Sequence, residues 1–162
     1  MKWMGTWVSL TLLLAACGES TRTDVDLQEV AHASVSYADG MTFSTRYTFA
    51  LSERVLLGAW SKNGPAQGYR SKEESLSLSE EQASQLQSLI DGIRLSEPRQ
   101  SGECWEDTAS LSLQLTDAEG AEHRYPTDPE RQRCNGAELF AEEEDVQAFL
   151  DACRALLPEP AL

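Results

Sequence analysis

Apolar and polar residues alternate along the first part of the chain in a way that predicts β-structure. Apolar side chains occupy every second position from Ala31 to Tyr37, and a longer alternating run extends from Phe43 to Leu51. Between the two runs, Asp39-Gly40 is a strong hairpin signal. A period of two indicates a strand with one buried and one solvent-exposed face. We therefore expect two paired antiparallel strands.

The next segment, Arg54 to Trp60, is apolar with little alternation, which is typical of a central strand covered on both faces. Residues 61–75 are rich in Gly, Ser and charged residues, and Asn63-Gly64-Pro65 lies within them. This composition predicts a long exposed loop. The loop carries Tyr69, Arg70 and Lys72, and loops carry function more often than strands do.

Two amphipathic helices are predicted. Ser79-Glu80-Glu81-Gln82 has the pattern of a capping box, and apolar residues from Ala83 to Ile93 then recur at helical spacing before Pro98. A second apolar stripe runs from Val146 to Leu157 and stops at Pro158. The acidic residues 142–145 fall in its first turn, where carboxylates complement the positive end of the helix dipole.

A second hairpin is expected between the two helices. Leu111, Leu113 and Leu115 alternate with polar residues, a turn follows at 117–120, and His123 and Tyr125 alternate on the return strand. We expect His123 to be a buried, hydrogen-bonded core histidine, whereas His32 lies on the solvent side of its strand. The order β-β-β-α-β-β-α predicts an α+β fold with an antiparallel sheet of about five strands and two helices on one face. Strand order stays open.

The N-terminal residues have the organisation of a secretory signal. One basic residue, Lys2, precedes an apolar core from Trp7 to Leu14 that is too short to span a bilayer, and small residues follow it. The stretch Leu14-Ala15-Ala16-Cys17 resembles the lipobox of bacterial lipoproteins. That resemblance implies cleavage before Cys17, a diacylglyceryl thioether on Cys17 and fatty acylation of the new N-terminus. The alternatives are an ordinary secretory signal and an uncleaved apolar N-terminus.

This interpretation divides the chain into a signal peptide (1–16), a lipidated cysteine with a flexible polar tether (17–29) and one α+β domain (30–158). Gly18 stands where inner-membrane lipoproteins of familiar bacteria carry aspartate, so the resemblance implies the outer membrane more than the inner one. The expected location is the bacterial cell envelope, facing the periplasm or the outside.

Charge narrows the choice of partners. The chain has 13 Lys and Arg against 27 Asp and Glu, a net charge of −14, and loss of the leader removes one further lysine. Nucleic acids and anionic lipid headgroups bind through Lys and Arg, so we expect neither to bind the domain. The expected contact with the membrane is through the lipid anchor, because two or more acyl chains hold a protein stably.

Three cysteines remain once Cys17 is assigned to lipid. Exported compartments are oxidising, so we expect one disulfide, with Cys104–Cys134 preferred because folding of the second hairpin brings their segments together. The rival pairing joins Cys134 to Cys153. Cys153 lies on the apolar stripe near the C-terminal end of its helix, where the dipole disfavours a thiolate, so we interpret it as a buried hydrophobe and not a nucleophile.

No motif for catalysis or for a cofactor accompanies these features. The cysteines lack zinc-type spacing, and no phosphate-binding glycine loop, dinucleotide fingerprint or nucleophile elbow occurs. A weak surface calcium site around residues 142–145 stays open. We therefore expect a non-enzymatic binding or interaction module with no metal or cofactor, and with a protein of the envelope as a candidate partner.

Two surfaces are candidates for binding. One is the sheet face without helices, which carries Arg46 and Thr48, and the other is the loop with Tyr69 and Arg70. Inhibition of exported hydrolases is a variant of this function. Two alternatives differ in class: an envelope enzyme that uses His123 with a nearby carboxylate, and a structural lipoprotein whose anchor matters more than its domain.

Overall fold

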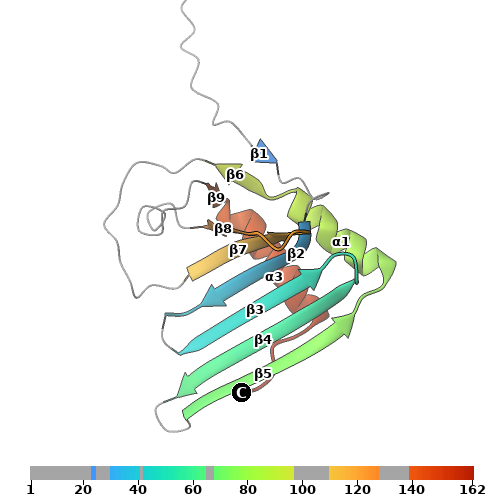
Figure 1. Cartoon of the computed structure of the whole chain (residues 1–162). Helices are drawn as coiled ribbons and strands as arrows, with labels where there is room; N and C mark the ends of the chain where they lie inside the picture. The colour runs from blue at the N-terminus through green and yellow to red at the C-terminus, as the bar shows by residue number, and fades with distance from the viewer. Residues whose placement is uncertain (1–22, 25–29, 41, 65–67, 97–109, 128–138) are drawn as a thin grey trace, which may run out of the picture.

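The computed structural model describes residues 23–24, 30–40, 42–64, 68–96, 110–127 and 139–162. Helices α1 (Glu80–Asp91) and α3 (Glu143–Leu156) pack on one face of an antiparallel sheet (Figure 1). The sheet has six strands in the order β5-β4-β3-β2-β7-β8. Their bounds are β2 Val30–Ala38, β3 Phe43–Ala50, β4 Val55–Gly64, β5 Gly68–Ser77, β7 Ser110–Asp117 and β8 Glu122–Pro126. The predicted α+β class is confirmed, and the order of strands and helices broadly matches the prediction.

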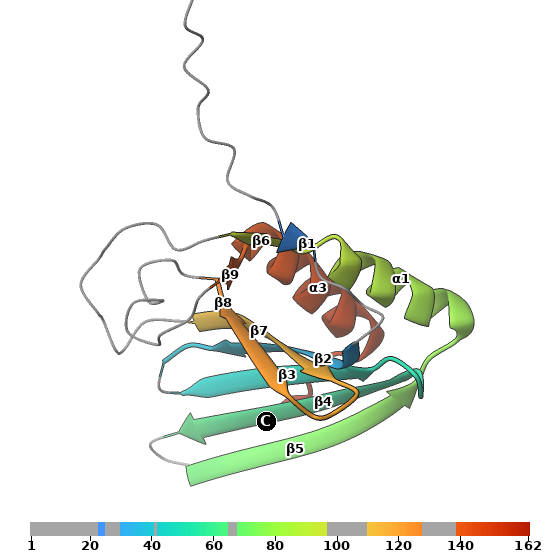
Figure 2. The same ribbon diagram turned by 45° about the horizontal axis from the view of Figure 1, so that its top comes forward.

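A second, smaller sheet was not predicted. It joins β1 (Thr23–Asp24), β6 (Arg94–Ser96) and β9 (Phe140–Ala141), with β6 in the middle. Figure 2 shows it on the helix side of the main sheet. Such short strands carry no periodic signal of their own and are defined by their pairing. Because β1 belongs to residues 17–29, part of the predicted tether is paired with the domain.

The core lies between the helices and the main sheet. Tyr47 and Trp60 are buried at its centre, with ring centroids 5.7 Å apart in an edge-to-face arrangement. The Tyr47 hydroxyl donates to the Leu157 carbonyl oxygen at 2.8 Å and accepts from Trp60 Nε1 at 3.3 Å. The fully buried large side chains around them include Val35, Phe49, Leu56, Leu86, Ile90, Leu113, Phe149 and Leu150. The predicted apolar stripes of both helices therefore face the sheet.

The turn of the first hairpin and the capping box of the first helix both form as predicted. Asp39 Oδ1 accepts from the amides of Thr42 and Phe43, each at 2.8 Å, at the turn between β2 and β3. At the start of α1, Ser79 Oγ accepts from the Gln82 amide at 3.2 Å, and Gln82 Oε1 accepts from the Ser79 amide at 2.9 Å.

None of the helices within the described ranges has the length and apolar character needed to cross a membrane.

Residues 61–75 are not the predicted loop. The strand β4 continues to Gly64, and β5 begins at Gly68 and pairs with β4 along its whole length. The sequence gives no sign of β5, because β5 is an edge strand whose side chains are almost all exposed. Its residues therefore show no alternation of apolar and polar side chains. The prediction that 54–60 is covered on both faces was also wrong. Leu57 is 45% exposed, because no helix packs on that face.

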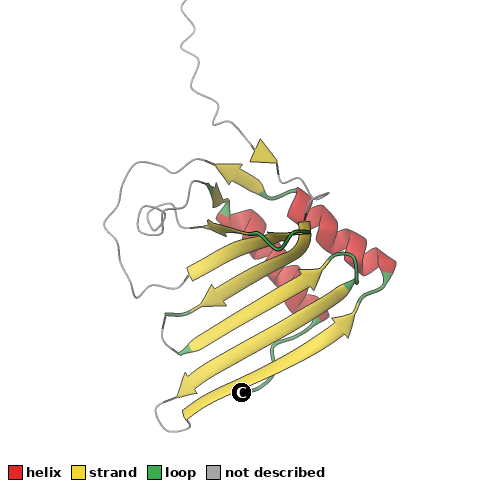
Figure 3. Ribbon diagram, viewed as in Figure 1, coloured by secondary structure: helices red, strands yellow, loops and turns green. Residues whose placement is uncertain are grey.

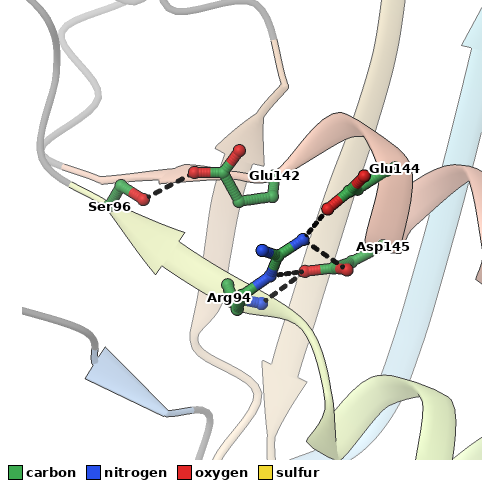
Figure 4. A network of polar contacts seen from close by, with 5 residues as sticks. All are labelled: Arg94, Ser96, Glu142, Glu144 and Asp145. Carbon is green, nitrogen blue, oxygen red and sulfur yellow. Dashed lines mark hydrogen bonds and ion pairs between the residues drawn. The ribbon is translucent and has the colours of Figure 1, made fainter.

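One polar network fixes the small sheet to the start of α3 (Figure 4). Arg94 Nε donates to Asp145 Oδ2 at 2.8 Å, the Arg94 amide donates to the same oxygen at 3.0 Å, and the guanidinium also pairs with Glu144. Ser96 Oγ donates to Glu142 Oε1 at 2.9 Å. These contacts raise the pKa of Arg94 above its ordinary range, chiefly through Asp145. The acidic cluster therefore has a structural role.

Candidate ligand-binding face

The face of the main sheet opposite the helices carries no other element of the described structure (Figure 3). Directly opposed residues of paired strands point to the same side, so the register groups its side chains into rows across the sheet. One row contains Ser112, Ser36, Arg46, Ala59 and Glu73 in that order. The next row contains Ser110, Ala38, Ser44, Ser61 and Ser71. The second row consists entirely of Ser and Ala.

These two rows line a hollow of about 420 Å³. The Ser and Ala row forms its floor, the Arg46 row forms one wall, and Tyr69 also lines it. We call this hollow the serine trough. The small floor side chains leave the space open, whereas the longer side chains of Arg46, Glu73 and Tyr69 surround it. Its volume lies in the range of small-molecule sites.

A second hollow of about 500 Å³ lies beyond the Arg46 row. It is lined by Thr48, Leu57 and Ser75, and it shares Arg46, Ala59 and Glu73 with the serine trough. Arg46, Ala59 and Glu73 therefore lie where the two hollows meet, and Arg46 can contact a ligand in either one.

Arg46 is exposed and only partly engaged. Its Nε donates to Ser36 Oγ at 3.1 Å, which holds the guanidinium over the sheet. Within the described part of the chain, no hydrogen bond or ion pair occupies its two terminal nitrogens. A guanidinium presents its donors in a planar fork that matches a carboxylate. Arg46 therefore has free donors for an anionic group in the hollow.

Hydroxyl groups on this face pair with one another across the strands. Ser44 Oγ and Ser61 Oγ lie 2.6 Å apart on the floor of the serine trough, and Ser34 Oγ and Thr48 Oγ1 lie 2.8 Å apart. Each hydroxyl has one donor and two acceptor sites, so a paired hydroxyl can still bond to a ligand. The face offers both donors and acceptors.

The structure separates two of the residues predicted to act together. Tyr69 is opposite Asn63 on the uncovered face and is 70% exposed, whereas Arg70 is opposite Lys62 and points to the helix side. The hairpin β4–β5 instead brings Tyr69 to the same hollow as Arg46. The sequence predicted Arg46 and Tyr69 as parts of two alternative surfaces, and they belong to one.

His123 is not the buried histidine that was predicted. It faces the helix side, opposite Leu115, but β8 is an edge strand beyond the helices and the His123 side chain is 56% exposed. Its Nε2 lies 4.0 Å from Asp117 Oδ2. Neither residue lines the two hollows that meet at Arg46. The pair of His123 and Asp117 therefore lies on the exposed edge strand, outside both hollows.

The remaining predicted sites are structural or cannot be placed. Cys153 is a buried free thiol, as predicted, and burial raises its pKa to about 12, which keeps it protonated at neutral pH. Cys17, Cys104 and Cys134 lie outside the described residues. No group of three or more potential metal ligands forms in the ranges that the structure describes. In the acidic cluster, Glu144 and Asp145 contact Arg94, and Glu142 contacts Ser96.

Sequence reasoning missed Glu73 and the Ser and Ala floor. Glu73 is in the same row as Arg46, two strands away, with the small Ala59 between them. Ser44 and Ser110 are polar positions of strands that the sequence predicts, whereas Ser61 and Ser71 fall in the predicted loop. Comparison with protein-family models and with the sequences of curated proteins finds no match.

Proposed function

We propose that this protein is a lipid-anchored, non-enzymatic binding module of the bacterial envelope, and that it binds its ligand on the uncovered sheet face at Arg46. Attachment through Cys17 rests on the likeness of residues 14–17 to a lipobox. The observation that carries the binding site is the meeting of two hollows at Arg46, whose terminal nitrogens have no partner in the described structure. An exposed arginine in a hollow of an acidic protein is a specific attachment point for an anionic group.

The position at which the N-terminal chain joins the domain is compatible with binding on the uncovered face. The first described strand, β1, pairs with β6 on the helix side of the main sheet (Figure 2). A tether from Cys17 therefore reaches the domain on the side opposite the uncovered face.

Cosedimentation with purified cell-envelope fragments tests this function. The full mature chain with Cys17→Ser is used, so that acyl chains do not contribute to binding. Arg46→Ala should reduce the bound fraction at least about tenfold, a loss expected for a charge-assisted contact. Arg70→Ala removes the same charge from the opposite side of β5 and should bind as the parent chain does. Equal binding by the parent chain and Arg46→Ala would contradict the proposal.

A further inference from the structure

We infer that the serine trough binds a carboxylate-bearing oligosaccharide, with the glycan chain lying across the strands. This inference rests on the proposed function and adds the class of ligand. Three properties of the described residues carry it: the shape of the floor, the chemistry of the walls and the small number of exposed apolar side chains.

The floor of the trough has the dimensions of a short linear polymer. Its five Ser and Ala residues come from five neighbouring strands, β7, β2, β3, β4 and β5. With strands about 4.8 Å apart, the row extends roughly 19 Å. Because no side chain longer than serine stands in this row, a chain of sugar rings can lie along it without displacing protein atoms.

The groups around the floor match the groups of an acidic sugar. Serine hydroxyls both donate and accept, as sugar hydroxyls do. The free fork of Arg46 is suited to a carboxylate, and the Glu73 carboxylate, two strands away in the same row, can accept from sugar hydroxyls. The negative face of the exposed Tyr69 ring attracts the slightly positive C–H groups of a sugar ring.

The same face is poorly suited to the other ligand classes. Specific protein interfaces have clustered apolar or aromatic anchors at their centre. The two exposed large apolar side chains of the described residues, Leu57 and Tyr69, are both on this face but line different hollows and form no cluster. Glu73 repels a dense polyanion such as a nucleic acid, as does the net charge of −14. The inferred ligand therefore has sparse carboxylates separated by hydroxyl groups.

Calorimetry on the detergent-solubilised, full mature lipoprotein tests the inference with four probes of matched length. Two carry sugar-linked carboxylates that are separated by neutral sugars and come from different sources: an oligosaccharide of alternating uronate and neutral residues, and a peptide-free glycan strand of the bacterial cell wall. The other two are a neutral oligosaccharide and a poly-glutamate peptide. We expect at least one acidic glycan to bind at least tenfold more tightly than the neutral oligosaccharide and the peptide. The tighter of the two glycans identifies the source.

Variants then locate the binding. Arg46→Ala and Tyr69→Ala should each weaken binding of the acidic glycan at least tenfold, and Arg70→Ala should leave it unchanged. Binding of poly-glutamate as tight as that of the glycans, or of the neutral sugar as tight as the acidic one, would overturn the glycan inference. Failure of every glycan to bind, together with envelope cosedimentation that still depends on Arg46, would overturn the ligand class while the proposed function stands. Envelope binding that does not depend on Arg46 would overturn both.

Discussion

At the scale of single residues, packing in the core explains why position 58 of β4 is a glycine. It lies on the helix side of the strand, and a Cβ added there would stand 2.4 Å and 2.6 Å from two atoms of the Trp60 ring. Glycine inside a strand is ordinarily unfavourable. Here it makes room for the indole, which in turn donates to Tyr47.

We predict that Gly58→Ala destabilises the protein by about 1–3 kcal/mol, because the buried indole must move or the strand must shift. Gly92→Ala is the matched control. Its added Cβ would meet only backbone oxygens of α1, at 3.4 Å and 3.5 Å, in a helical conformation. Urea denaturation followed by tryptophan fluorescence measures both. Equal stability of Gly58→Ala and the parent chain would show that the indole does not depend on this space.

Cys153 gives a prediction about alkaline pH. A thiol in the unfolded chain titrates near its ordinary value of 9.0, whereas burial raises the pKa of Cys153 in the folded protein to about 12. Between these values the unfolded state binds fewer protons than the folded state. The free energy of unfolding therefore falls as pH rises above about 9, by up to about 1.4 kcal/mol per pH unit from this group, and is unaffected by it below pH 9.

The measurement is the free energy of unfolding between pH 8 and pH 11, compared with that of Cys153→Ala. The variant is less stable at pH 8 because it loses a buried side chain, but its stability should fall less steeply with pH. Burial also raises the pKa of Tyr47 and Tyr125, so a shallower decline near pH 10 and above should remain in the variant. Identical slopes for both chains would contradict the assignment to Cys153.

At the scale of secondary-structure elements, the first turn of α1 depends on reciprocal hydrogen bonds between Ser79 and Gln82. We predict that Ser79→Ala lowers the free energy of unfolding by about 1 kcal/mol, because an amide of the first turn loses its partner. Ser77→Ala, at an exposed position at the end of β5, is the control and should change stability little. Thermal denaturation followed by circular dichroism measures both, and equal midpoints for the two variants would argue against the capping role.

Elements with a long apolar stripe were predictable from the sequence, and strands that are exposed or too short to show a stripe were missed. The strands β2, β3 and β7 and both helices each carry a periodic apolar stripe, and all were predicted. The strand β5 has no such stripe because it is an exposed edge, and β1, β6 and β9 are too short to show one. Burial leaves a pattern in the sequence, and hydrogen-bonded pairing at an edge does not.

The candidate site was predictable only in part, for the same reason. Arg46 could be placed on the uncovered face, because β3 alternates clearly. Its proximity to Tyr69 could not be derived, since it depends on the hairpin from β4 to β5 and on the register of that pair. The floor of the serine trough depends on register across five strands. A long-range register of this kind is fixed by the folded sheet and not by any local pattern.

At the scale of the whole molecule, the chain that leads from Cys17 joins the described domain at β1, on the helix side of the main sheet. We predict that the mature protein from its native host begins at Cys17 and carries a diacylglyceryl group and a fatty acyl chain, as intact-protein mass spectrometry would show. Cys17→Ser should carry no adduct and should leave the membrane fraction, whereas Cys153→Ala should retain both lipid and membrane attachment. An unmodified Cys17 at the mature N-terminus, or a retained leader, would contradict the anchor.

The most direct test of the proposed binding site is to find which residues respond when a ligand binds. The measurement is amide chemical-shift mapping by nuclear magnetic resonance as the tighter-binding acidic oligosaccharide is added. We expect the largest changes in amide chemical shift at Arg46 and Tyr69 and at the Ser and Ala residues of the serine trough. Unchanged spectra, or shifts concentrated on α1, α3 or β8, would contradict the claim that the uncovered face at Arg46 is the binding site.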